Sequence, residues 1–315
     1  MNEMMQKLAN TIIANLGNTS DIGLFKGKTG IALFLYEYAK KLPRASTYEE
    51  VADILIDDMY NQINSSTSSD IIDGIAGIGL GASYLLKNKL LEGDPDEVLE
   101  DIDRRLLENP RDVLLKEMTS PVPVFSSGLY FLSRFSFGNE EQKERWINHL
   151  CDAAIFFVLD TVNIQHMEPP LSFLNSMLFV FNRLSGYCDK NGKSNINQLL
   201  HDSLIMIVRA IQHNRFSDID IQILKELKKT LPAELCEEYD QCLKPLSAIN
   251  MHTINMEELA DELWWYFIYE IDILSTYPKE EIEKYVEQKL LDYSYDIEII
   301  NSQFAVLGLL LFDSN

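Results

Sequence analysis

Three side chains are the candidates for acid–base chemistry. Asp73 stands immediately before the glycine-rich stretch Gly74–Gly81, Glu37 interrupts an apolar stretch, and His166 lies in a polar segment that precedes another apolar run. Histidine can exchange a proton near neutral pH. A pair of carboxylates, such as Glu37 with Asp73, is the arrangement that most glycosidases use. The sequence therefore offers Asp73, His166 and Glu37 as catalytic candidates.

Each of these residues also has a structural interpretation. Asp73 can be the N-cap of the helix that follows it, where its carboxylate would accept backbone N–H bonds. An ionised Glu37 in a buried helix needs a partner, and Lys26 or Lys28 could supply the opposite charge. A histidine in a loop with no identified partner, such as His166, has no assigned role.

The cysteines do not form a metal-binding pattern. None of Cys151, Cys188, Cys236 and Cys242 is followed by a histidine, and His149 stands two residues from Cys151, on a different face of a helix. Four cysteines are also too few for a disulfide scaffold. We therefore predict structural thiols and no metal site.

Two groups of residues are ligand-binding candidates. Glycines at the starts of two apolar helices would leave N-terminal N–H groups available to an anion. Two adjacent tryptophans could line a sugar or peptide groove, or could pack in the core. The candidates are Gly27, Gly30, Gly74, Gly77, Trp264 and Trp265.

The elements that must position these residues form a repeat. Small residues near the starts of apolar helices occur at Gly30, Gly77, Gly128 and Ser176, at intervals of 47, 51 and 48 residues. Ala305 aligns as a further, degenerate copy. This interval fits a pair of helices with their loops. One helix of each pair is apolar on all sides and predicts burial, whereas the other has a single apolar stripe and predicts an outer layer.

No alternating run of β-branched residues predicts a strand, so we expect an all-α fold. The sequence has room for roughly six or seven helix pairs of this length, which is enough to close an α/α toroid. An open α-solenoid is the alternative. We predict one domain over residues 1–315.

The charge of the chain limits the classes of partner that it can bind. The chain has 27 Lys and Arg against 49 Asp and Glu, a formal net charge of −22. Such a charge repels nucleic acid and anionic membranes and could favour a cationic peptide. The first residues lack the pattern of a signal peptide, and the longest apolar runs are too short to span a bilayer. We expect a cytoplasmic protein.

The glycine-rich helix starts resemble a known family. Gly27-x-x-Gly30-Ile31-Ala32 and the stretch Asp73–Gly79 are similar to those of the lanthionine synthetase C-like (LanC-like) proteins, over about residues 23–106 and less clearly over 125–186. The resemblance implies an α/α toroid in which zinc activates a cysteine thiolate of a precursor peptide for addition to a dehydrated Ser or Thr. The family holds zinc with one cysteine and a later adjacent Cys-His pair, and this chain has no such pair.

We therefore expect a LanC-like protein of lantibiotic-type peptide maturation that binds a precursor peptide or a peptide-modifying enzyme and does not itself catalyse. The alternatives are a peptide-modifying cyclase with an altered site, and an α/α-toroid glycosidase or polysaccharide lyase. Zinc is the cofactor that the family implies, but the sequence gives no ligands for it.

Overall fold

The computed structural model describes residues 3–42, 47–108, 110–159, 167–187, 190–213, 215–244, 256–271, 277–291 and 300–312. These residues form sixteen α-helices and short 3-10 turns, and no strand is found among them. The all-α prediction is confirmed. The chain divides into two compact units, Met1–Asp94 with Ile254–Asn315, and Pro95–Thr253. A single domain over residues 1–315 stays a prediction.

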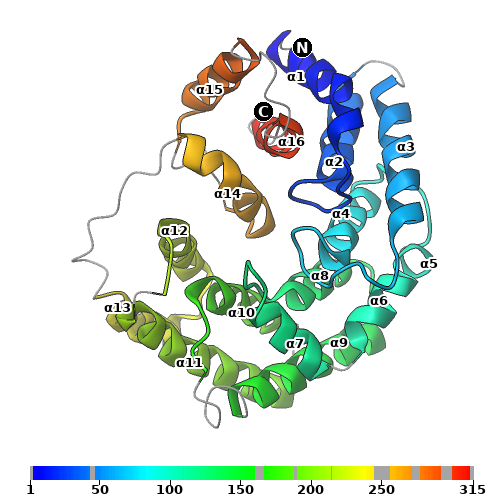
Figure 1. Cartoon of the computed structure of the whole chain (residues 1–315). Helices are drawn as coiled ribbons and strands as arrows, with labels where there is room; N and C mark the ends of the chain where they lie inside the picture. The colour runs from blue at the N-terminus through cyan, green and yellow to red at the C-terminus, as the bar shows by residue number, and fades with distance from the viewer. Residues whose placement is uncertain are drawn as a thin grey trace. The chain divides into compact units, whose positions relative to one another are not determined.

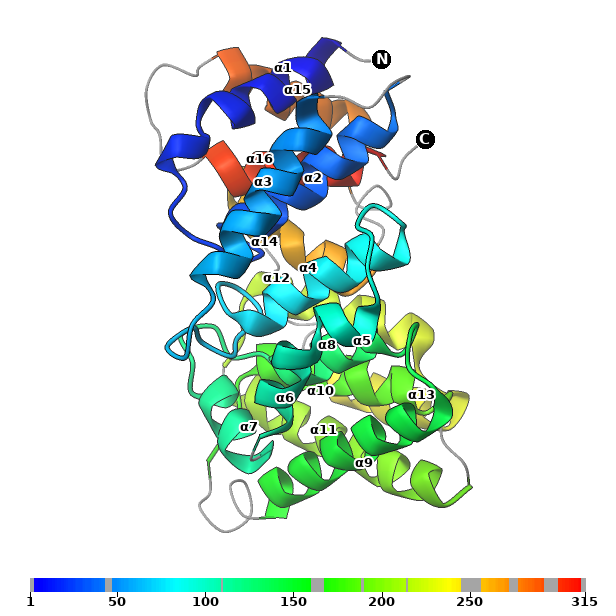
Figure 2. The ribbon, with the colours of Figure 1, turned by 90° about the vertical axis from the view of Figure 1, so that its right-hand side faces the viewer.

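The first unit joins the two ends of the chain. Its helices are α1 (Glu3–Ala14), α2 (Lys28–Lys40), α3 (Thr47–Gln62), α4 (Ile75–Lys87), α14 (Met256–Ile268), α15 (Lys279–Leu291) and α16 (Ile300–Phe312). Within this unit, α16 packs between α14 and α2, and α4 packs on α2 (Figure 1). Helix α3 lies along α2 (Figure 2).

The two helices that start with glycine are buried on nearly all sides. Every residue from Lys28 to Ala39 in α2 is buried, as are ten of the thirteen residues of α4. In contrast, α3 buries only one stripe of four residues. Burial thus separates the two predicted kinds of helix within this unit, as the apolar pattern requires.

The second unit contains α5 (Pro95–Val98), α6 (Glu100–Leu107), α7 (Pro110–Met118), α8 (Ser126–Arg134), α9 (Glu140–Phe156), α10 (Leu171–Leu184), α11 (Lys190–Gln212), α12 (Asp218–Leu227) and α13 (Ala233–Leu243). Asn139 and Gln142 form a capping box at the start of α9, which satisfies two backbone N–H groups there. The buried helix α10 packs on α8, α11 and α12, and α9 packs beside α11 (Figure 2).

Two positions of the predicted repeat are wrong. Gly30, Gly77 and Gly128 each occupy the third position of a helix, but α10 begins at Leu171, so Ser176 lies in its second turn. In α16, Ala305 is also in the second turn. A small residue matched by type alone does not show where a helix begins.

Candidate functional site

The candidate site is the pair of loops that lead into α2 and α4. The backbone N–H of Lys28 donates to the carbonyl of Asp21 at 2.9 Å, and that of Ile75 donates to the carbonyl of Ser68, also at 2.9 Å. Donor and acceptor shift together by 47 residues, which is the interval between Gly30 and Gly77. The two helix starts therefore share one backbone design.

The glycines allow this design because the loop lies directly on the helix. A β-carbon at Gly30 would lie 2.2 Å from the carbonyl oxygen of Leu24, and one at Gly77 would lie 2.1 Å from that of Ile71. Leu24 and Ile71 are again 47 residues apart. Real β-carbons do not approach backbone atoms so closely, so glycine is needed for space at both positions.

The preceding glycines of the motif have the same role. A β-carbon at Gly27 would lie 2.7 Å from the oxygen of Asp21, and one at Gly74 would lie 2.6 Å from the oxygen of Ser68. Both glycines are N-caps with a negative φ, −124° and −105°, which any residue can adopt. Close approach, and not backbone conformation, explains the Gly-x-x-Gly pattern.

The two loops are also bonded to each other. The backbone N–H groups of Leu24 and Phe25 both donate to the carbonyl of Ile72, at 2.8 and 3.1 Å. A β-carbon at Gly23 would lie 2.3 Å from the α-carbon of Asp73. These contacts hold the loops before α2 and α4 together, over residues 21–27 and 68–74. We call these two loops the platform.

Asp73 lies exposed on this platform, and its predicted N-cap role is wrong. The N-cap of α4 is Gly74, with no side-chain hydrogen bond. The carboxylate that organises the loop is Asp70, which accepts from the backbone N–H groups of Ile72 and Asp73 at 2.9 Å. Partial burial, followed by the charges of Asp70 and Asp21, raises the pKa of Asp73 above its ordinary value, while Lys26 opposes this.

The platform is a poor receptor for an anion. The N–H groups of Lys28 and Ile75 are already bonded to loop carbonyls, and the carboxylates of Asp21, Asp70 and Asp73 give the surface a negative charge. Cationic groups suit this surface better. A ligand role for Gly27, Gly30, Gly74 and Gly77 stays a prediction.

Both glycine-containing helix starts lie in the N-terminal part of the chain. Residues 1–122 match the lanthionine synthetase C-like protein family. The predicted LanC-like resemblance is thus confirmed for that region, which includes both glycine helices. No curated protein matches the chain.

The two predicted ligand-binding tryptophans, Trp264 and Trp265, pack against the loop that leads into α2 in the LanC-like region. Trp264 is buried, its indole N–H donates to the carbonyl of Phe25 at 3.1 Å, and its ring occupies the space beside Gly30. Trp265 is also buried and meets the ring of Phe25 edge-on, with centroids 4.7 Å apart. Both rings hold α14 against the α2 loop, and ligand binding by them stays a prediction.

Glu37 has partners other than those predicted. Its carboxylate accepts from the hydroxyl of Tyr84 at 3.1 Å and lies 3.8 Å from the ammonium of Lys40. Lys28 instead pairs with Asp58 of α3 at 2.5 Å. Glu37 and Tyr84 are one repeat interval apart, so this bond joins equivalent turns of α2 and α4.

The predicted catalytic pair of Glu37 and Asp73 stays a prediction, and the backbone places the two residues at different levels along α4. Asp73 precedes α4, whereas Glu37 bonds to Tyr84, the tenth residue of that helix. At 1.5 Å per residue the two levels are on the order of 15 Å apart along the helix. Glycosidase carboxyl groups lie roughly 5–9.5 Å apart.

Metal ligands do not gather in the described residues. No group of three His, Cys, Asp or Glu side chains there could hold a metal ion. Cys151 is buried in α9, and the sulfur of Cys236 lies 3.5 Å from the carbonyl oxygen of Pro232. His166 and Cys188 lie outside the described residues.

The start of α8, which contains the third predicted glycine, Gly128, is arranged differently from the starts of α2 and α4. A β-carbon at Gly128 would meet the ring of Phe125 at 2.5 Å and not a loop carbonyl. The buried carboxylate of Glu117 accepts from the backbone N–H of Ser127 at 2.9 Å and from its hydroxyl at 3.2 Å. Glu117 therefore satisfies this end of α8 from the preceding helix α7.

Sequence reasoning missed a buried charge cluster around Arg134 of α8. The guanidinium is 0% exposed and pairs with Asp96 at 2.7 Å and with Asp103 at 2.9 Å. It also lies 5.3 Å from the ring centroid of Trp146. The available signal was one charged residue in an apolar stretch, which requires partners as Glu37 does.

Proposed function

We propose that this chain is a LanC-like protein of lantibiotic-type peptide maturation that binds a peptide or a peptide-modifying enzyme and does not close thioether rings. The observation that carries the proposal is that one feature of the family is present and another is absent. The chain keeps the glycine platform in its LanC-like region, but no cysteine in the sequence is followed by histidine. A scaffold whose sequence lacks the family's Cys-His ligand pair fits binding better than zinc-dependent ring closure.

Zinc does not fit the residues that the structure describes. A zinc-activated thiolate needs three protein ligands that converge and an open position for the peptide thiol. Cys151 and Cys236 lie on different helices, α9 and α13, and neither belongs to a cluster of metal-binding side chains within the described ranges. We therefore assign no step to zinc.

A cationic peptide is the partner class that the charge favours. The formal net charge is −22, and the platform carries the carboxylates of Asp21, Asp70 and Asp73. Lysines or arginines of a precursor peptide, or of a modifying enzyme, would gain from this field, and binding would weaken as salt screens it.

We also propose that the helix pairs close into an α/α toroid. Within the first unit, α16, from the end of the chain, packs on α2, from its beginning, and α14 packs on α16. The rings of Phe34 and Phe312 stack with centroids 5.9 Å apart, and Gly308 leaves space for Phe34. First and last repeats meet in a closed ring but not in an open solenoid.

A ring-closure assay tests the proposal. Full-length protein is incubated with a synthetic peptide that contains one cysteine and one dehydroalanine, and the remaining thiol is alkylated and counted by mass spectrometry. Ring closure leaves the peptide mass unchanged, so alkylation distinguishes the two states. We expect complete alkylation, equal to that without protein. Loss of the thiol together with stoichiometric zinc in the purified protein would contradict the proposal.

Binding is measured separately by the fluorescence anisotropy of a labelled lysine-rich precursor peptide. We expect saturable binding that weakens with added salt. A matched peptide with glutamate in place of lysine is the control and should not bind. Equal behaviour of the two peptides would contradict the charge preference.

A further inference from the structure

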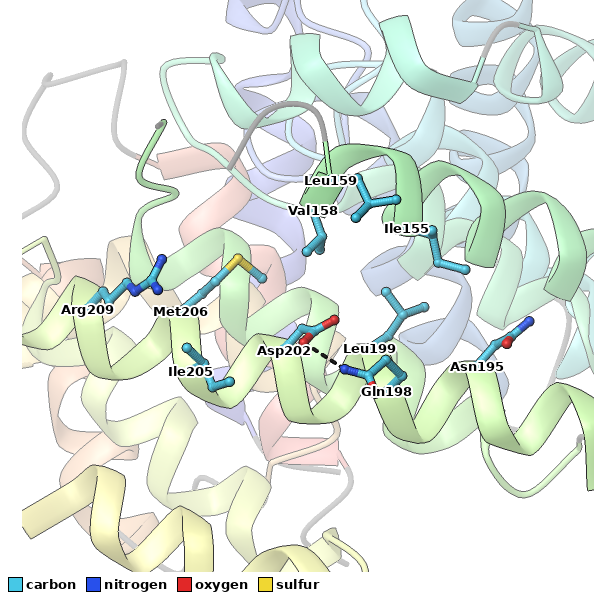
Figure 3. A pocket seen from close by; sticks show the side chains of 10 residues that line it. All are labelled: Ile155, Val158, Leu159, Asn195, Gln198, Leu199, Asp202, Ile205, Met206 and Arg209. Atoms are coloured by element: carbon cyan, nitrogen blue, oxygen red, sulfur yellow. Dashed lines mark hydrogen bonds between the residues drawn. The ribbon is translucent and has the colours of Figure 1, made fainter. Parts of the chain in front are cut away.

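An apolar groove lies between the end of α9 and the middle of α11, within the second unit. Its volume is about 460 Å³, and Figure 3 shows its lining. Ile155, Val158 and Leu159 come from α9 and the turn after it, and Leu199, Ile205 and Met206 come from α11. The volume is that of a site for a small ligand or for large side chains of another protein.

Exposed apolar side chains gather at this groove. Leu159, from the turn after α9, is 58% exposed, and Ile205 of α11 is 40% exposed. These are two of the seven exposed large hydrophobic residues found in the described part of the chain. Single exposed hydrophobic residues are ordinary, but a cluster of them indicates an interaction surface.

Two opposite charges flank the apolar centre of the groove. Asp202 and Arg209 both line it from α11, seven residues apart, or about 10 Å along the helix. Ile205 and Met206 lie midway between them. Asp202 accepts a hydrogen bond from Gln198 at 3.0 Å, whereas no ion pair to Arg209 is found among the described side chains (Figure 3).

We propose that a second copy of this chain occupies the groove. In a two-fold interface, if residue i meets residue j, then residue j also meets residue i. An antiparallel pairing of α11 centred between Ile205 and Met206 would place Asp202 opposite the partner's Arg209, and Arg209 opposite the partner's Asp202. The exposed Ile205 side chains of both copies would meet near the centre, and both charges would be paired. This self-complementary pattern favours a homodimer over an unrelated partner.

The dimer should be concentration-dependent. Ten residues line the groove, and stable interfaces use about 20–30 residues a side. Sedimentation equilibrium of the full chain over a range of concentrations should therefore show a mass that rises from 36.2 kDa toward twice that value. A single 36.2 kDa species at every concentration would overturn the proposal.

Charge exchange identifies the interface. Asp202→Arg and Arg209→Asp, each alone, place like charges opposite each other and should weaken the dimer about tenfold or more. The double variant restores opposite pairs and should recover the dimer. Ile54→Lys on α3, at an exposed isoleucine that does not line the groove, is the control and should dimerise normally. A double variant that stays monomeric while its circular dichroism is unchanged, or single variants that dimerise like the control, would contradict the assignment.

Discussion

The carbonyl oxygen of Ile71 lies 2.1 Å from the point where a β-carbon at Gly77 would be. The same relationship joins Leu24 to Gly30, 47 residues earlier, at 2.2 Å. In both cases the loop folds back onto the third residue of the helix. Because the contact is with backbone, no side-chain rotation can relieve a larger residue there.

We therefore predict that Gly77→Ala and Gly30→Ala each lower the free energy of unfolding by about 1–3 kcal/mol, because the loop must move away from the helix. Urea denaturation followed by circular dichroism measures this. Gly17→Ala is the matched control, since a β-carbon there meets nothing within 4 Å, and it should change stability by about 0.5 kcal/mol or less. Equal effects at Gly17 and Gly77 would refute the space argument.

A second prediction concerns the buried charge of Arg134. Arg134→Met leaves the largely buried carboxylate of Asp103 without its cationic partner, with the hydroxyl of Tyr130 still donating to it, and should cost about 3–5 kcal/mol. Arg104→Met removes an exposed pair with Asp101, which solvent screens, and should change stability much less than Arg134→Met. Thermal unfolding of both variants compares the two sites. A small loss at Arg134 would show that the cluster is well hydrated.

A third prediction concerns pH. Burial raises the pKa of Asp220, although the backbone N–H and hydroxyl of Ser217 donate to its carboxylate. The folded state then binds more protons than the unfolded state between the ordinary pKa, about 3.9, and the raised pKa. The contribution of Asp220 to stability is thus present at low pH and lost as pH rises through this window. Relative to Asp220→Asn, the wild type should lose stability with rising pH in urea titrations.

Asp58 is the control of opposite sign. Hydrogen bonds from Lys28 and Gln62 lower its pKa, so its contribution is present above the ordinary pKa and lost as pH falls through the lowered value. Relative to Asp58→Asn, the wild type should gain stability as pH rises. The same slope for both variants would show that these shifts do not govern the pH dependence.

A fourth prediction separates packing from ligand binding at the tryptophans. All three tryptophans of the chain, Trp146, Trp264 and Trp265, are buried. Iodide should therefore quench their fluorescence much less in the native protein than in urea. Trp264→Phe removes the bond to the carbonyl of Phe25 and should cost about 1–3 kcal/mol. Strong quenching of the native protein that disappears when saturating unlabelled peptide is added would instead support an exposed ligand groove.

Among the described helices, none combines the length and the apolar composition that a membrane span requires, as the short apolar runs of the sequence predicted. The all-helical fold and the LanC-like region were also predictable. Both depend on local features: the spacing of apolar residues decides which helix is buried, and glycine decides where a loop can lie on a helix. These features are visible within about fifty consecutive residues.

The partners of the charged residues were not predictable in this way. Glu37 meets Tyr84 and Lys40 where Lys26 or Lys28 was expected. Asp73 leaves the capping of α4 to Gly74 and to a loop carbonyl. The sequence alone indicated that charged residues inside apolar stretches, such as Glu37, would be buried and would therefore need partners. Only the tertiary structure decided which partners they have, because a hydrogen bond or ion pair forms only within a few ångströms, and chain segments far apart in the sequence set that distance.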